Sequence, residues 1–211
     1  MAQEVFLAGS ESTSSSIEWA MTELLLNPEA MAKAKAELTR AIGPNRKLQE
    51  SDIDNLPYLN AVVKETLRLH PAIPFLVPRK ATNDTEFMGY LIPKGTQVLV
   101  NAWAIGRDPD VWDDPMCFKP ERFLQLGNND KRVDYRGQDF EYIPFGAGRR
   151  ICAGLPLAHR LLHFVLGSLV QEFEWKVGGK VTRERIDMRD RLGIVSRKLE
   201  PLFAIPTKCM P

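Results

Sequence analysis

The chain has 211 residues, of which 44% are hydrophobic and 26% are charged, a composition typical of a soluble globular protein and not of a disordered one. Its formal net charge is +1, with 28 Lys and Arg against 27 Asp and Glu, so nothing in the charge favours a nucleic acid as partner. The 3 cysteines form no close pair, which argues against both a disulfide framework and a zinc site. No run reaches the roughly 20 apolar residues of a membrane-spanning helix.

The amino-terminal part of the chain is predicted to be helical. Residues 3–26 have apolar ends and a middle rich in Ser, Thr and Gly, which are neutral to poor helix formers, so this helix needs packing on both sides. Asn27 followed by Pro28 is a helix start. Gly43 followed by Pro44 ends the second helix.

After residue 50 the pattern changes from helices to short strands. Ser51 with Asp54 resembles a capping box, and residues 58–69 form an amphipathic helix that His70-Pro71 ends. Prolines then separate short runs rich in strand-forming residues. These runs predict strands at 75–77, 87–92 and 97–100.

The second half of the chain begins with a long irregular segment. Residues 104–150 are interrupted by prolines, and a loop of this length in a compact domain usually has a specific role. Residues 153–173 are apolar almost all round and predict a buried helix. Two strands within 174–181 are predicted around a Gly-Gly turn, and a last strand at 202–205. The fold class is therefore mainly α with small β-sheets.

One segment carries most of the chemical information. Residues 145–154 read Phe-Gly-Ala-Gly-Arg-Arg-Ile-Cys-Ala-Gly, a glycine-rich loop that delivers Cys152 to the start of a helix. The glycines allow a flat ligand to approach the backbone, and the helix dipole with Arg149 and Arg150 favours thiolate over thiol. A lone cysteine is most often a buried structural residue. The spacing Phe-x-x-Gly-x-Arg-x-Cys-x-Gly, however, has a chance frequency on the order of 10⁻⁷ per start point.

This loop resembles the haem-binding loop of the cytochrome P450 family. The resemblance implies haem b as cofactor with Cys152 as the iron ligand, and Phe145, Arg150 and Gly154 in contact with the cofactor. Arg79, in Val-Pro-Arg, matches a residue that pairs with a haem propionate in relatives, as suits a planar guanidinium facing a carboxylate. Residues 1–211 would then be a partial cytochrome P450 domain, from the oxygen-activation helix to the last strand, without the amino-terminal half and membrane anchor of the family.

A second resemblance concerns a Glu–Arg–Arg network. Glu65 and Arg68 lie three residues apart on a predicted helix and share a face, which by itself predicts only a surface ion pair. Followed by Leu-His-Pro and later by Pro-Glu-Arg122-Phe, the pair resembles the buried network that braces the family's haem loop. The resemblance makes Glu65, Arg68 and Arg122 structural residues.

The segment Ala8-Gly-Ser-Glu-Ser-Thr13 resembles the oxygen-activation segment of the family. Gly9 would allow a local distortion of the helix, Glu11 would supply an acid, and Ser12 with Thr13 would supply hydroxyls that relay protons. The family usually has Thr where this chain has Ser12, which is less restricted at χ1. Taken alone, the segment is equally well interpreted as a Ser-rich helix packed against its neighbours.

The resemblance also implies a function. Residues 17–20 and 101–109 are similar to plant microsomal A-type members, near the branch of geraniol and other terpenoid hydroxylases. It implies a monooxygenase that uses O2 and electrons from NADPH through NADPH–cytochrome P450 reductase on a small lipophilic terpenoid or alkaloid. The location would be the cytosolic face of the endoplasmic reticulum membrane, reached only through the absent anchor. Segments 6–13, 72–77 and 192–197 would line the substrate pocket.

Three alternatives stay open. The chain could be a non-catalytic fragment or incomplete gene product that at most binds haem. A haem-based gas sensor would leave Glu11 and Ser12 without a role. His159 and His163 lie four apart on one predicted helix and could bind a metal, but no third ligand is evident nearby, so they are better interpreted as polar positions on an apolar helix.

Overall fold

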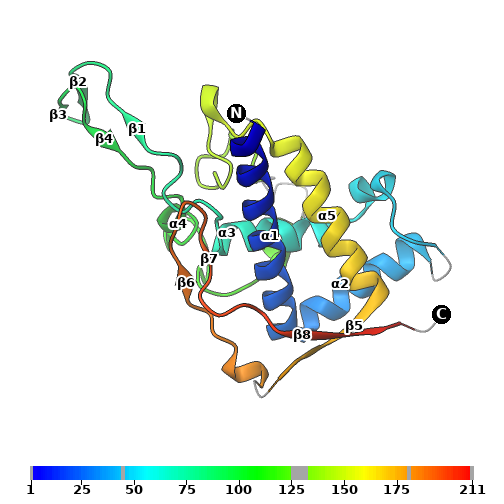
Figure 1. Cartoon of the computed structure of the whole chain (residues 1–211). Helices are drawn as coiled ribbons and strands as arrows, with labels where there is room; N and C mark the ends of the chain where they lie inside the picture. Colours follow the sequence, from blue (N-terminus) through cyan, green and yellow to red (C-terminus); the bar gives the residue numbers. More distant parts are fainter. Residues whose placement is uncertain (1, 44–45, 125–132, 180–181, 210–211) are drawn as a thin grey trace.

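The computed structural model describes residues 2–43, 46–124, 133–179 and 182–209. Four helices form its centre: α1 (Ala2–Leu26), α2 (Pro28–Ile42), α3 (Pro57–Leu69) and α5 (Leu155–Glu172). All four were predicted from the sequence within two residues or so at each end. Figure 1 shows α1 in blue at the centre with α5 in yellow beside it, and α3 crossing behind α1.

The hydrophobic core lies where these four helices meet. One residue from each helix illustrates the packing, since each is at most 1% exposed: Leu24, Leu38, Leu59 and Leu166. Full burial of such a side chain stabilises the fold by about 1.5–3 kcal/mol. The amphipathic patterns of α2 and α3 are satisfied by this arrangement, because their apolar faces turn toward it.

The prediction for α5 was only half right. Its buried side chains lie on one face, whereas Leu157 is 64% exposed, Phe164 39% and Leu161 38%. A helix that is apolar on every side can be buried on every side, but in the described chain only one face of α5 packs against other elements.

The strands form four two-stranded antiparallel sheets among the described residues. The pairs are β1 (Arg79–Lys80) with β4 (Gln97–Val98), β2 (Thr85–Phe87) with β3 (Tyr90–Ile92), β5 (Phe173–Val177) with β8 (Ala204–Lys208), and β6 (Asp190–Arg191) with β7 (Arg197–Lys198). In Figure 1 the first two pairs form an arm that extends away from the helices.

Several strand predictions were wrong. No strand forms at 75–77, because the chain turns there with Leu76 in the left-handed region at φ 50°. The run 87–92 is split into β2 and β3 by Met88 and Gly89, whose φ angles of 52° and 80° suit a hairpin turn. β5 pairs with the distant β8 and not with a strand after Gly178-Gly179; residues 180–181 of that prediction lie outside the described residues.

Smaller features complete the chain. The 3-10 helix η1 (Glu50–Asn55) begins before Ser51, and the Gln49 N–H donates to Asp52 Oδ2 at 2.8 Å, so the capping box predicted at Ser51 is displaced by two residues. Segment 104–150 is mostly irregular, as predicted, apart from the end of α4 (Ala102–Ile105), η2 (Pro120–Phe123) and η3 (Gly148–Arg150). No described helix is both long and apolar enough to cross a membrane.

Candidate functional site

The cysteine loop is held in shape by its own backbone. The Cys152 N–H donates to the Phe145 carbonyl oxygen at 3.0 Å, and the Leu155 N–H donates to the Cys152 carbonyl oxygen at 3.2 Å. Gly146 and Gly148 have φ angles of 73° and 66°, a region that side chains with a Cβ rarely adopt. The loop therefore needs glycine at these two positions, and it leaves Cys152 exposed just before α5.

Cys152 lines a mainly apolar cavity of about 270 Å³ between α1, the chain that follows α3, and the cysteine loop. Apolar walls come from Ile73, Leu76 and Val77, and Val77 is 66% exposed. An exposed thiol on an apolar surface is characteristic of a site for a ligand and not of a core.

Two guanidinium groups border the same cavity. Arg79 is placed by β1, whose pairing with β4 sets Arg79 opposite Val98. Arg150 comes from η3, two residues before Cys152. Haem presents an apolar macrocycle, an iron that needs an axial ligand, and two carboxylates. The thiol, the apolar walls and the two arginines fit these three requirements.

The predicted cofactor residues are not all equivalent. Phe145, Arg79, Arg150 and Cys152 line the cavity. Gly154 instead caps the amino-terminal end of α5, and a Cβ at this position would stand 3.7 Å from Cys152 Sγ. Its place is thus beside the thiol and not on the wall.

The three predicted oxygen-activation residues separate in the structure. Ser12 and Thr13 line the cavity, and Ser12 Oγ donates to the Ala8 carbonyl oxygen at 2.6 Å. Glu11 is not among the lining residues; its carboxylate lies 3.8 Å from the Arg197 guanidinium. α1 runs as one unbroken α-helix through Gly9, the position where a distortion was expected.

Glu65, Arg68 and Arg122 are brought together beside the core. Arg68 donates to both Glu65 oxygens at 2.7 and 2.8 Å, and Arg122 Nε donates to Glu65 at 3.0 Å. Glu65 and Arg68 are 0% and 1% exposed. Because an unpaired buried charge costs several kcal/mol, each of these groups needs the others.

The network also reaches the irregular segment that leads to the cysteine loop. Arg68 donates to the carbonyl oxygens of Gly106, Pro115 and Cys117 at 2.6–3.1 Å. Glu65 accepts from the Lys119 backbone N–H at 2.8 Å. A chain with little secondary structure is thereby fixed to α3.

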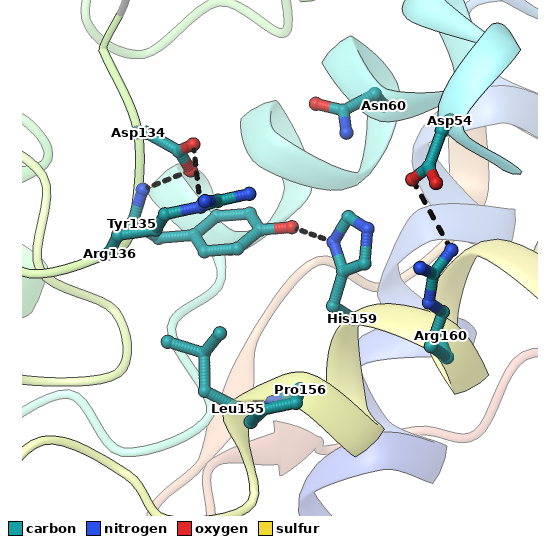
Figure 2. Close-up of a pocket in the computed structure, with 9 residues that line it drawn as sticks. All are labelled: Asp54, Asn60, Asp134, Tyr135, Arg136, Leu155, Pro156, His159 and Arg160. Atoms are coloured by element: carbon teal, nitrogen blue, oxygen red, sulfur yellow. Dashed lines mark hydrogen bonds and ion pairs between the residues drawn. The ribbon is translucent and has the colours of Figure 1, made fainter.

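A second, larger cavity of about 440 Å³ lies at the first turn of α5 and does not contain Cys152. Figure 2 shows the Tyr135 hydroxyl pointing at His159 Nδ1, and Arg160 reaching toward Asp54. Burial raises the pKa of Tyr135 and lowers that of His159. The centroids of the Tyr135 and Phe145 rings are 5.3 Å apart, so this cavity lies next to the cysteine loop.

Sequence reasoning missed several residues of both cavities. Leu67, Ala158 and Leu162 line the Cys152 cavity, but in the sequence they are apolar helix positions like any in the core. Tyr135 and Arg136 belong to no motif. Residues 192–197, which were predicted to line the substrate pocket, do not line the Cys152 cavity.

Among the described residues, no group of three or more His, Cys, Asp or Glu side chains is arranged to hold a metal ion, and this includes the surroundings of His159 and His163.

Comparison with known proteins decides the family. A sequence model of cytochrome P450 matches residues 1–203, almost the whole chain. The chain belongs to the cytochrome P450 family. A zebrafish cytochrome P450 solved with abiraterone has the same fold, with a TM-score of 0.85 at 36% identity over 99% of this chain and 46% of that one.

Plant relatives in the cytochrome P450 family are closer in sequence. Cytochrome P450 76A1 of Solanum melongena is 61% identical over 97% of this chain, and the iridoid oxidase of Catharanthus roseus is 60% identical over 97%. The geraniol 8-hydroxylase of Catharanthus roseus is 53% identical over 98%. The chain spans about two-fifths of the length of these relatives, at 43%, 39% and 41%.

Proposed function

We propose that this chain forms the haem-binding part of a monooxygenase. The reaction is RH + O2 + NADPH + H⁺ → ROH + H2O + NADP⁺, so one oxygen atom enters a C–H bond and the other leaves as water. The observation that carries the proposal is the exposed Cys152 thiol on an apolar cavity bordered by Arg79 and Arg150. Bound haem would supply the activation of O2.

The chain's own residues have distinct tasks in this proposal. Cys152 binds the iron, while Arg79 and Arg150 bind the propionates. Ser12 and Thr13 present hydroxyls to the cavity, where they pass protons inward. Glu65, Arg68 and Arg122 keep the segment before the cysteine loop in place.

The substrate class is a small lipophilic molecule, a terpenoid or alkaloid. Ile73, Leu76 and Val77 offer it apolar walls. Relatives named iridoid oxidase and geraniol 8-hydroxylase support the terpenoid class. The electron donor is NADPH–cytochrome P450 reductase, and the place of action is the cytosolic face of the endoplasmic reticulum.

The alternative is a haem-binding product without turnover. It is favoured by the apolar side chains that stay exposed on α1 and α5, such as Phe6 at 73% and Leu157 at 64%. Both functions share the Cys152 site, so they differ in turnover and not in ligation.

The test is the carbon monoxide difference spectrum of the haem-loaded, reduced chain. We expect the long-wavelength Soret band of thiolate ligation in the wild type. Cys152→Ser should abolish this band, while Cys117→Ser, a matched change at another exposed cysteine, should preserve it. A band of unchanged position and height in Cys152→Ser would refute Cys152 as the ligand. Hydroxylated product formed per NADPH, with reductase and geraniol, then separates the enzyme from the haem-binding product.

A further inference from the structure

Strand β7 lies along the helix that carries the oxygen-activation segment. Positions four apart on α1 share a face, and Glu11, Ser15 and Trp19 form such a row. Three successive residues around β7 contact this row. Ser196 O accepts from Ser15 Oγ at 2.8 Å, Arg197 Nη1 stands 3.8 Å from Glu11 Oε1, and Lys198 Nζ lies 4.4 Å from the Trp19 ring centroid.

Both neighbours of Arg197 in this strand are anchored, Ser196 through its backbone and Lys198 through its side chain. The Ser196 N–H donates to the Ala72 carbonyl oxygen at 2.8 Å, and Ala72 lines the Cys152 cavity. Ser15 and Ser196 are 3% and 6% exposed, so these hydrogen bonds are shielded from water. Lys198, 5% exposed, donates to the Asp187 carbonyl oxygen. The backbone of Arg197 therefore has a defined place relative to α1 and to the cavity.

The side chain of Arg197 is less restrained than its backbone. The Arg197 and Glu11 side chains are 54% and 39% exposed, and 3.8 Å is long for an ion pair. In the β6–β7 register Arg191 stands directly opposite Arg197, and like charges in this position repel. This repulsion favours the conformation in which Arg197 leans toward the Glu11 carboxylate.

Glu11 directly precedes the lining residue Ser12 in the chain, but it does not line the cavity itself and its carboxylate faces Arg197. We propose that Arg197 is the positioning residue of Glu11: it keeps the carboxylate between solvent and the Ser12 hydroxyl, so that protons enter the cavity in step with electrons. The inference rests on the proposed monooxygenase function. The resemblance placed Arg197 at the end of the predicted pocket-lining segment 192–197 but gave it no link to Glu11, which lies 186 residues earlier in the chain (197 − 11).

Loss of this positioning has a defined chemical consequence. If proton delivery is not coordinated with electron transfer, the two electrons from NADPH reduce O2 to hydrogen peroxide and the substrate is not oxidised: NADPH + H⁺ + O2 → NADP⁺ + H2O2. We expect Arg197→Gln to raise the peroxide formed per NADPH by about two- to fivefold, the effect of losing one exposed ion pair. Arg197→Lys, which keeps the charge, should restore most of the coupling.

The experiment uses the haem-loaded protein with reductase, NADPH and geraniol as the probe substrate. Peroxide and hydroxylated product per NADPH are measured in H2O and in D2O for the wild type and for Arg197→Gln, Arg197→Lys, Glu11→Gln and the Glu11→Gln/Arg197→Gln double variant. Arg189→Gln is the charge-matched control. It also removes a cation from this part of the chain, but the Arg189 side chain pairs with Asp187 and not with Glu11.

Arg197→Gln is expected to change peroxide yield and solvent isotope effect while the carbon monoxide band stays as in the wild type. In the Glu11→Gln background it should add no further change. An unchanged peroxide yield in Arg197→Gln, or an equal rise in both backgrounds, would overturn the positioning role and leave the monooxygenase intact. A wild type without the thiolate band and without NADPH oxidation overturns both proposals.

Discussion

At the scale of single residues, His163 shows how burial controls a charge. It is 0% exposed, its Nδ1 donates to the His159 carbonyl oxygen at 2.6 Å, and Nε2 is buried without a hydrogen-bond partner in the described chain. Burial, and then the nearby His159, lowers the pKa of His163 from 6.5 to about 4. The folded protein therefore keeps this imidazole neutral where the unfolded chain would protonate it.

This shift predicts an acid-sensitive stability. Between pH 6.5 and 4 the unfolded state binds more protons, so the free energy of unfolding falls as pH falls, by on the order of 3 kcal/mol from this residue. We expect His163→Gln to remove this part of the pH dependence, since glutamine does not titrate. Urea unfolding of both proteins from pH 7.5 to pH 4 measures it. Parallel curves for the wild type and the variant would contradict the prediction.

At the scale of elements, α5 and its neighbours meet at Gly167. A Cβ built at this position would stand 2.6 Å from Leu48 Cδ2 and 3.0 Å from Leu59 Cδ2. Alanine favours a helix over glycine by about 1 kcal/mol, but overpacking a filled core costs about 1–3 kcal/mol. We expect Gly167→Ala to lower the free energy of unfolding, as measured by urea denaturation, because the clash involves two branched side chains.

A double-mutant cycle supplies the control for Gly167. Leu48→Ala removes the methyl groups that the new Cβ meets, so in the Gly167→Ala background it should cost less than in the wild type. If the free-energy costs of Leu48→Ala and Gly167→Ala were strictly additive, the methyl group introduced by Gly167→Ala would not contact the Leu48 side chain.

At the scale of the whole molecule, one face of α5 stays uncovered by the described chain. Leu157, Leu161 and Phe164 lie at spacings of four and three on the same side of the helix, and all are more than a third exposed. A contiguous apolar patch on a soluble surface favours association. We expect the 211-residue chain to self-associate at micromolar concentration, and Leu157→Glu to reduce the associated fraction in sedimentation velocity.

Ile194→Glu is the matched control for this association. Ile194 is 89% exposed and lies between β6 and β7, so it does not belong to the α5 face. Equal effects of the two variants would show that exposed apolar residues in general, and not the α5 face, drive the association.

Local signals in the sequence were sufficient for the helices and for the identity of the family. Caps, prolines and the 3.6-residue period depend on near neighbours, and α1, α2, α3 and α5 follow them. The cysteine loop is likewise a local motif, because its backbone hydrogen bonds join residues at most seven apart. The sequence by itself thus determined the helical class, the family and the place of Cys152.

Only the tertiary structure decided which distant segments meet. β5 pairs with β8 and not with a strand after the nearby Gly-Gly turn, and Arg197 reaches Glu11 across almost the full chain. Equally, Tyr135 meets His159, and of the two core residues Leu162 and Leu166 the first also lines the Cys152 cavity and the second does not. Such contacts are set by the simultaneous packing of all four helices, and no local pattern of residues encodes them.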